Sequence, residues 1–268
     1  MKWAGGKQRL LAQFEPYFPK AGTFGAYLEP FVGGGSVFFR VFGALKPRRC
    51  HLFDGNGDLI ETYQAIKDDP DGVIRELTKL RTGHSETHYY AVRDKLPTST
   101  VARAARIIYL NKTCYNGLYR VNSQGQFNVP MGRYVKPRIF DAENVHACSV
   151  ALKTASLERA DFRQIQKRAK KNDFVYFDPP YDPLSNTANF TAYTRTRFAR
   201  EDQAELAEIY RELDGRGCKL MLSNSDTKFI RELYRGFSIQ MITARRNINS
   251  SAKNRGPIGE VLVLNYKP

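Results

Sequence analysis

The chain has 268 residues, a mass of 30.6 kDa and a formal net charge of +15, with 42 Lys and Arg against 27 Asp and Glu. The length suits one α/β domain with a smaller insertion, and the charge favours a polyanionic partner over a merely basic surface. No apolar run is long enough to span a bilayer, no apolar signal segment opens the chain, and the four cysteines form no CxxC pair. We therefore expect an intracellular protein without a zinc site or a disulfide framework.

The first part of the chain predicts alternating strands and helices. A strand over residues 24–29 leads into a glycine turn at 33–35 and a helix that begins near Val37. A second strand covers residues 50–54, and apolar residues recur at helical spacing over 56–66. This alternation indicates the start of a wound α/β sheet.

The pattern changes between residues 70 and 146. Short helices, among them 101–110, precede a stretch at 115–133 that is rich in Gly, Asn and Gln and predicts a hairpin with loops. Cations alternate here with aromatic rings, a combination that suits phosphates and bases. The cations are Arg103, Arg106, Lys112, Arg120, Arg133, Lys136 and Arg138, and the rings are Tyr109, Tyr115, Tyr119 and Tyr134.

The α/β alternation returns after residue 146. Predicted strands cover 149–152, 174–178, 219–223, 239–243 and 260–265, and an amphipathic helix covers 200–213. The fold class is therefore α/β: a doubly wound, mostly parallel sheet from residues 1–56 and 147–268, with a mainly helical domain inserted at 57–146 that carries a hairpin. Ligands of such sheets bind at the carboxyl ends of the strands.

Four acids fall near the ends of predicted strands: Glu29, Asp54, Asp161 and Asp178. Any one of them could simply cap a helix or a turn. Together they outline a crevice along one edge of the sheet.

The run Asp178-Pro179-Pro180-Tyr181 follows an apolar strand. Prolines fix the backbone and lack an N–H, which leaves carbonyl oxygens as acceptors beside the Asp178 carboxylate. An exocyclic amino group can donate one hydrogen to Asp178 and one to the Pro179 carbonyl, while Tyr181 lies flat against its ring. The motif indicates a site for a planar amino group; a strand that happens to end in a Pro-Pro turn is the alternative.

The glycine-rich runs match neither common phosphate motif. A dinucleotide fingerprint that starts at Gly33 needs a glycine where Phe38 stands, and the N-terminal run ends in Gln8 where a phosphate loop needs a hydroxyl. A ligand with a ribose diol and no pyrophosphate, such as S-adenosylmethionine, remains suitable. Asp54 can accept from both ribose hydroxyls, Lys7 can bind a carboxylate, and Trp3 can face the sulfonium.

No metal site is predicted. His84 and His88 have the spacing of a helical metal pair, but no third ligand is near them in the sequence, and a solvated helix explains them better. A GxSxG nucleophile elbow is also missing.

Taken in order, several motifs resemble the Dam family, the D12 class of DNA adenine-N6 methyltransferases. They are Lys2-Trp3-Ala4-Gly5-Gly6-Lys7, Glu29-Pro30-Phe31-Val32-Gly33-Gly34-Gly35, Asp54 and Asp178-Pro179-Pro180-Tyr181. The runs 115–120, 128–134 and 188–193 are similar to the family's DNA-reading segments. The resemblance spans nearly the whole chain. It departs in lacking a short lead segment before Lys2, and it leaves Tyr119 without a role.

The resemblance implies a catalytic domain (1–56 and 147–268) that binds S-adenosylmethionine and releases S-adenosylhomocysteine, and a target-recognition domain at 57–146. The expected catalytic residues are Asp178, Pro179, Pro180 and Tyr181. The expected cofactor-binding residues are Trp3, Lys7, Glu29, Phe31, Gly33, Gly35, Asp54, Asp161, Phe162 and Asp178. The expected DNA-binding residues are Tyr115, Asn116, Arg120, Asn122, Pro130 and Arg133, with Arg120 as a reader of guanine.

The expected function is therefore methylation of an adenine, in GATC, that is flipped out of duplex DNA. Methylation of RNA or of a protein glutamine amide stays open as an alternative, as does a catalytically silent DNA-binding protein of the same fold. We expect the protein in the cytoplasm, at the nucleoid, or in the host cytoplasm if it is viral. A monomer is the default expectation.

Overall fold

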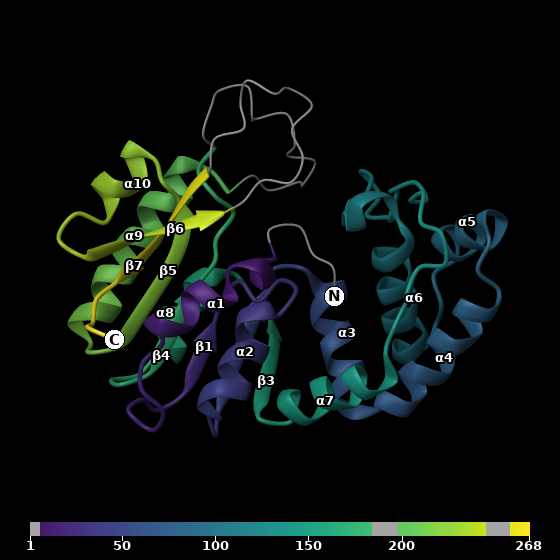
Figure 1. Ribbon diagram of the computed structural model, residues 1–268, viewed down its shortest axis with the longest axis horizontal. Helices are drawn as coiled ribbons and strands as arrows, with labels where there is room; N and C mark the ends of the chain where they lie inside the picture. The colour runs from purple at the N-terminus through teal and green to yellow at the C-terminus, as the bar shows by residue number, and fades with distance from the viewer. Residues whose placement is uncertain (1–5, 184–197, 245–257) are drawn as a thin grey trace.

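The computed structural model describes residues 6–183, 198–244 and 258–268 (Figure 1). Among them, no helix is both long and apolar enough to cross a membrane. One seven-stranded sheet has the order β3-β2-β1-β4-β5-β7-β6, and only β7 runs antiparallel to its neighbours. The strands are β1 (Tyr27–Glu29), β2 (Cys50–Asp54), β3 (Ala155–Arg159), β4 (Phe174–Phe177), β5 (Lys219–Ser225), β6 (Ser238–Ala244) and β7 (Ile258–Leu264).

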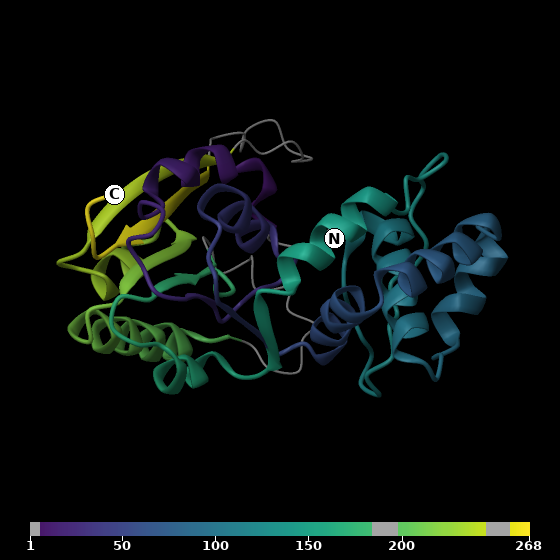
Figure 2. The same ribbon diagram turned by 90° about the horizontal axis from the view of Figure 1, so that it is seen from below.

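Helices cover both faces of this sheet because its central strands are apolar on both sides. Along β4, Phe174 and Tyr176 belong to one core cluster, whereas Val175 and Phe177 belong to the other. The first face is covered by α1 (Leu11–Phe14) and α2 (Ser36–Leu45), and the second by α8 (Ile165–Arg168), α9 (Arg200–Gly215) and α10 (Lys228–Leu233). Figure 2 shows the sheet between these layers. The predicted doubly wound, mostly parallel fold is confirmed.

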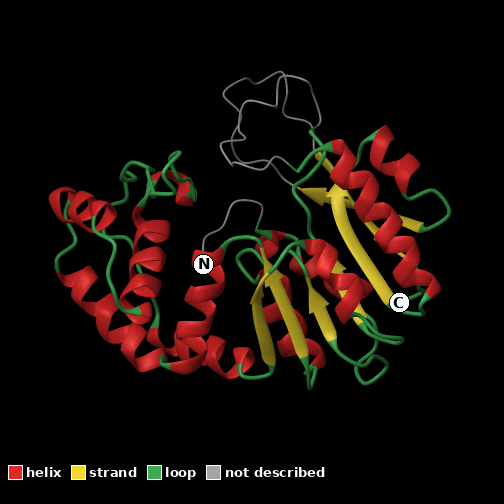
Figure 3. Ribbon diagram, turned by 180° about the vertical axis from the view of Figure 1, so that it is seen from behind, coloured by secondary structure: helices red, strands yellow, loops and turns green. Residues whose placement is uncertain are grey.

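A lobe of helices lies between β2 and β3 in the chain and beside the β3 edge in space (Figures 1 and 3). It contains α3 (Gly57–Asp68), α4 (Pro70–Thr82), α5 (Glu86–Asp94), α6 (Thr100–Thr113) and α7 (Ala142–Leu152). Each begins at a residue whose side chain accepts a backbone hydrogen bond from the first turn, the standard way to satisfy those N–H groups. These N-caps are Asn56, Asp69, Ser85, Ser99 and Asp141.

The predicted hairpin at 115–133 is a loop rather than a regular ladder. A 3-10 turn at η3 (Tyr115–Gly117) opens it, and two isolated antiparallel bridges, Cys114 to Met131 and Val121 to Phe127, close it. The buried Tyr89 ties this loop to α5, since its hydroxyl donates to the Val129 carbonyl at 2.9 Å.

Two strand predictions need correction. Residues 149–152 belong to α7, because Val145, Ser149 and Leu152 share one buried helical face while Val150 is exposed; the strand begins only at Ala155. The strand predicted over 24–29 is limited to β1. The boundaries 57 and 146 of the recognition domain stay a prediction; residue 146 lies within α7.

Three of the seven cations predicted for nucleic acid have partners within the lobe. Arg103 pairs with Glu61 of α3, and Arg138 pairs with Asp141. Arg106 is buried and donates from Nε to the Val92 carbonyl at 2.8 Å near the end of α5. Arg133 and Lys136 are exposed.

Two glycines near and within α2 give a test of the fold. Gly35 has φ of 70°, and a Cβ there would lie 2.8 Å from the Phe39 ring, whereas a Cβ at Gly43 meets nothing within 4 Å. We expect Gly35→Ala to lower the free energy of unfolding by about 1–3 kcal/mol. Gly43→Ala, the matched control, should raise it by about 0.4–1 kcal/mol. Urea denaturation measures both, and equal stabilities of the two variants would contradict the packing described.

Candidate active site

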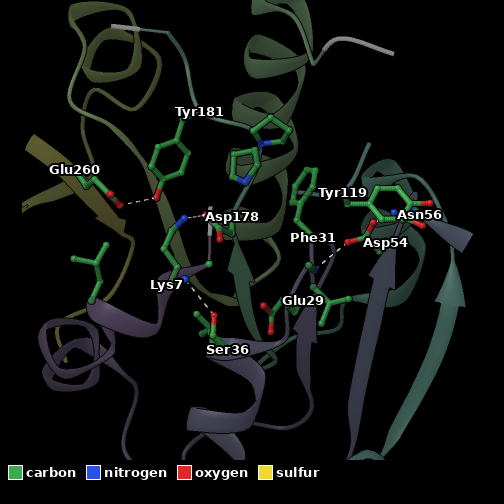
Figure 4. Close-up of a pocket in the computed structure, with 18 of the residues that line it drawn as sticks. Lys7, Glu29, Phe31, Ser36, Asp54, Asn56, Tyr119, Asp178, Tyr181 and Glu260 are labelled. Atoms are coloured by element: carbon green, nitrogen blue, oxygen red, sulfur yellow. Dashed lines mark hydrogen bonds and ion pairs between the residues drawn. The ribbon is translucent and has the colours of Figure 1, made fainter. Parts of the chain in front are cut away.

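A crevice lies where the strand order reverses. From β1 the chain moves to β2 and β3 on one side, then returns to β4 on the other, so the carboxyl ends of β1 and β4 leave an opening between their loops. A pocket of about 860 Å³ occupies this place (Figure 4). Its volume falls in the usual range for small-molecule sites, roughly 300–1,000 Å³.

The pocket is acidic although the chain is strongly basic. Glu29, Asp54, Asp178 and Glu260 line it, against the cations Lys7 and Arg9. An acid-rich wall favours a ligand that carries positive charge and disfavours a di- or triphosphate.

Asp178 follows β4 at the centre of the pocket. Its Oδ1 lies 2.8 Å from Lys7 Nζ and accepts a hydrogen bond from Ser223 Oγ at 2.9 Å. Burial raises the pKa of this carboxyl above its ordinary value, while Lys7 and Ser223 act in the opposite direction. Lys7 Nζ also lies 4.3 Å from the centre of the Tyr181 ring, so one ammonium group contacts two of the four predicted catalytic residues.

Tyr181 is held at its far end. Its hydroxyl donates to Glu260 Oε2 at 2.9 Å. Burial raises the pKa of Glu260, opposed by Lys7 and by the tyrosine hydroxyl. Glu260 was missed in the sequence because it lies near the start of a strand rather than at its end. Only the antiparallel direction of β7, which pairs Glu260 with Ser225, brings it to the carboxyl end of β5.

The backbone after the Pro-Pro pair is also fixed. Gln203 of α9 donates to the Pro180 carbonyl at 2.8 Å and accepts from Asn224 of β5 at 3.1 Å. Asn224 in turn accepts from the backbone N–H of Asp182 at 3.1 Å. The predicted catalytic run is therefore attached to a helix and a neighbouring strand.

Asp54 holds the glycine turn. Its two oxygens accept from the backbone N–H groups of Gly33 and Asn56, each at 2.9 Å, and Tyr63 donates to the Gly33 carbonyl at 2.7 Å. Gly33 has φ of 46°, a conformation that side chains disfavour. Gly33 and Gly34 line the pocket, but Gly35 is buried behind it against Phe39 and Tyr63.

Glu29 lies deeper in the pocket and is almost fully buried. It accepts from the Tyr27 hydroxyl at 2.6 Å, and burial raises the pKa of its carboxyl well above the ordinary value. The acid is therefore a fixed part of the pocket wall.

The remaining predicted cofactor residues are placed differently. Phe31 lines the pocket, and Phe162 stacks behind it with ring centres 5.5 Å apart. Asp161 is exposed, pairs with Arg163 at 3.0 Å and is not among the lining residues. Trp3 lies outside the described residues, as does the run 188–193.

The predicted DNA-binding residues gather on the loop after α6. Tyr115 is 53% exposed, its backbone N–H donates to the Pro130 carbonyl at 2.9 Å, and Asn116 beside it has φ of 54°. Arg120 donates from Nε to Asn128 Oδ1 at 2.7 Å. The Asn122 side-chain oxygen accepts from the backbone of Gln124 and Gln126, so this residue shapes the turn at the end of the loop.

The histidine pair lies against a ring rather than along a solvated helix. His84 precedes α5 and its Nδ1 is 2.8 Å from the Tyr109 hydroxyl; His88 packs edge-on to the same ring. Within residues 6–183, 198–244 and 258–268 no group of three or more His, Cys, Asp or Glu could hold a metal ion.

Comparisons with known proteins agree across the chain. A family model described as D12 class N6 adenine-specific DNA methyltransferase matches residues 3–248. The type II methyltransferase M.MjaIII of Methanocaldococcus jannaschii is 44% identical, covering 99% of this chain and 98% of its own length. The type II methyltransferase M1.LlaDCHI of Lactococcus lactis is 42% identical (99% and 94%), and the DNA adenine methylase of Escherichia coli K12 is 40% identical (100% and 95%).

The environment of Asp178 predicts its titration. Its pKa should lie above the ordinary value of 3.8, and Ser223→Ala should raise it further by removing a hydrogen bond to the ionised form. Since the folded pKa exceeds the unfolded one, this carboxyl favours folding below its ordinary pKa, and that contribution is lost as pH rises through the raised value. Carboxyl-carbon NMR of labelled aspartate measures the pKa directly.

Tyr176→Phe is the matched control for this titration, because it removes the other hydroxyl at Ser223 and leaves the bond from Ser223 to Asp178 in place. A pKa of Asp178 that is unchanged in Ser223→Ala, or that rises equally in both variants, would contradict the arrangement.

Proposed function

We propose that this chain, which belongs to the D12 class of N6 adenine-specific DNA methyltransferases, methylates an adenine that it flips out of duplex DNA, with GATC as its preferred site. The observation that carries the proposal is the meeting of Asp178, Pro179 and Tyr181 at an acid-lined pocket. The family match covers nearly all of the chain and favours DNA over RNA or a glutamine amide as the substrate.

The pocket residues fit S-adenosylmethionine. Its acids outnumber its cations, as suits a ligand with a sulfonium and an ammonium group, and the turn at Gly33 brings backbone to the pocket surface. Asp54 already accepts two backbone hydrogen bonds, and each carboxylate oxygen has a further lone pair for a ribose hydroxyl. When bound, the cofactor supplies a methyl group activated by the positive charge of its sulfur.

Asp178 and the Pro179 carbonyl grip the target amino group in this proposal. The carboxylate accepts one N6 hydrogen and the carbonyl accepts the other, which turns the nitrogen lone pair away from conjugation with the base. Lys7 and Ser223 both contact Oδ1, so Oδ2 is the oxygen that accepts from N6. Burial raises the pKa of Asp178 and makes it a better acceptor for the N6 proton lost after transfer.

Tyr181 stacks on the flipped base. Its hydroxyl is fixed by Glu260, so the ring has its plane set before the base arrives. Gln203 and Asn224 hold the adjoining backbone and keep the Pro179 carbonyl in place relative to Asp178.

DNA binding falls to the loop after α6. Tyr115 is the exposed aromatic side chain at its start, suited to entering the base stack where the adenine leaves it. Asn128 fixes the plane of the Arg120 guanidinium, which then presents a fork to guanine O6 and N7. Asn116 and Pro130 lie beside Tyr115, and the exposed Arg133 is suited to a phosphate.

We infer that the enzyme acts where cellular DNA is, in the cytoplasm at the nucleoid or in an infected host. We also infer that it is a monomer, which solution scattering with and without a GATC duplex tests.

The catalytic assignment predicts that Asp178→Ala loses methyl transfer to duplex DNA by at least about 100-fold, because the amino group loses its acceptor at the reacting centre. Transfer from labelled S-adenosylmethionine measures this. Asp68→Ala, an exposed acid of α3, is the control and should keep wild-type activity. If the wild type transfers methyl groups only to RNA or protein, RNA or a glutamine amide is the substrate instead. If it binds DNA without transferring a methyl group, it is a catalytically silent DNA-binding protein.

The specificity assignment predicts that Arg120→Ala loses about 1–3 kcal/mol of discrimination between GATC and near-cognate duplexes. Arg133→Ala should weaken all duplexes about equally and reduce the salt dependence of binding by about one ion. Competition between the GATC and near-cognate duplexes, repeated over a range of salt concentrations, measures both the discrimination and the salt dependence. An unchanged preference in Arg120→Ala would refute its role as a reader.

A further inference from the structure

Tyr119 is the member of the inserted lobe that lines the pocket. Eighteen of the residues around the pocket come from other parts of the chain, Asn56 among them as the N-cap of α3, and Tyr119 comes from the loop after α6. Figure 4 shows it next to Asn56 and Asp54, on the side away from Glu260. The ring therefore stands beside the carboxylate proposed to bind the ribose.

Contacts with α3 and with Phe127 hold this ring in place. Its hydroxyl donates to Asp58 Oδ2 in the first turn of α3 at 2.6 Å, and its edge packs on Phe127 with ring centres 5.9 Å apart. Burial and the neighbouring Asp58 raise the pKa of the phenol above its ordinary value, so the hydroxyl remains a donor at neutral pH.

Arg120, the next residue in the chain, is the residue proposed to read DNA. Arg120 is fixed by Asn128 through its Nε and through a second bond to the Asn128 carbonyl at 3.2 Å. Tyr119 at the pocket and Arg120 on the DNA-reading loop are joined by one peptide bond, so a shift of either moves the other.

We propose that Tyr119 is a cofactor-binding residue supplied by the recognition loop, and that its bond to Asp58 couples the binding of cofactor to the binding of DNA. The ring closes the adenosine side of the pocket when the loop is seated. Because coupling free energy is reciprocal, bound cofactor tightens DNA binding by the factor by which DNA tightens cofactor binding. The inference rests on the proposed function for the identity of both ligands.

The first experiment needs no DNA. Calorimetry measures S-adenosylhomocysteine binding to the wild type, Tyr119→Ala, Tyr119→Phe and Tyr90→Phe, the last being a tyrosine of α5 that does not line the pocket. We expect about a tenfold weaker affinity for Tyr119→Ala, the scale of one lost aromatic wall, and less than about threefold for the other two. Circular dichroism and thermal unfolding confirm that each variant is folded.

The second experiment measures the coupling. Affinity for a GATC duplex is determined with and without S-adenosylhomocysteine for the wild type, Tyr119→Phe, Asp58→Ala and the double variant. The wild type should bind the duplex at least about fivefold more tightly with the cofactor product, and each single variant should reduce that factor to below about twofold. The double variant should lose no more than the larger single loss, since the bond between Tyr119 and Asp58 is removed in all three.

The outcomes separate the two levels of inference. Equal S-adenosylhomocysteine affinity in folded Tyr119→Ala and wild type overturns the role of Tyr119 in the pocket, and coupling that survives Tyr119→Phe overturns the role of its bond to Asp58. A wild-type protein that binds no S-adenosylhomocysteine at all overturns the proposed function itself.

Discussion

The buried pair of Lys7 and Asp178 is the interaction on which the site depends. A carboxylate enclosed beside a sheet is strongly destabilised unless charge and hydrogen bonds compensate it, and here an ammonium group at 2.8 Å and the Ser223 hydroxyl provide both. The same ammonium lies over the Tyr181 ring and near Glu260, so one cation organises the acid, the aromatic ring and the second acid. An amino group that enters the site meets acceptors already arranged for a nitrogen with several hydrogens.

The chain as a whole is basic, but its pocket is acidic. The whole chain is basic, which attracts a polyanion over the range of a Debye length, about 8–10 Å. The pocket inside it is acidic, which suits a cationic ligand at contact distance. Arg103 and Arg138 pair with acids of the inserted lobe, and Arg106 is buried inside it, so not all of the positive charge of this stretch is free of protein partners.

Most of the fold was predictable because strand residues and helix caps are local signals. The apolar run that forms β4 and the helical spacing after Asn56 are both legible in the sequence. The strand predicted at 149–152 was wrong because a short, mostly apolar run of four residues fits a helix face as well as a strand. Only the packing of α7 decides between the two. Asp54 and Asp178 were found because acids at the ends of parallel strands share an edge. Glu260 was not found because its position depends on the antiparallel direction of β7. Tyr119 was not found because its place at the pocket depends on how the inserted lobe folds back.

Lys7 contacts the Tyr181 ring and Glu260 contacts its hydroxyl, and this has a consequence for biosynthesis. The two residues are separated by nearly the entire length of the chain, yet both are needed around one ring. A nascent polypeptide that has completed the sheet up to β6 still lacks the acceptor for the tyrosine hydroxyl, because β7 follows β6 in the chain. The contacts around Tyr181 are therefore complete only after β7 has been synthesised and has left the ribosome.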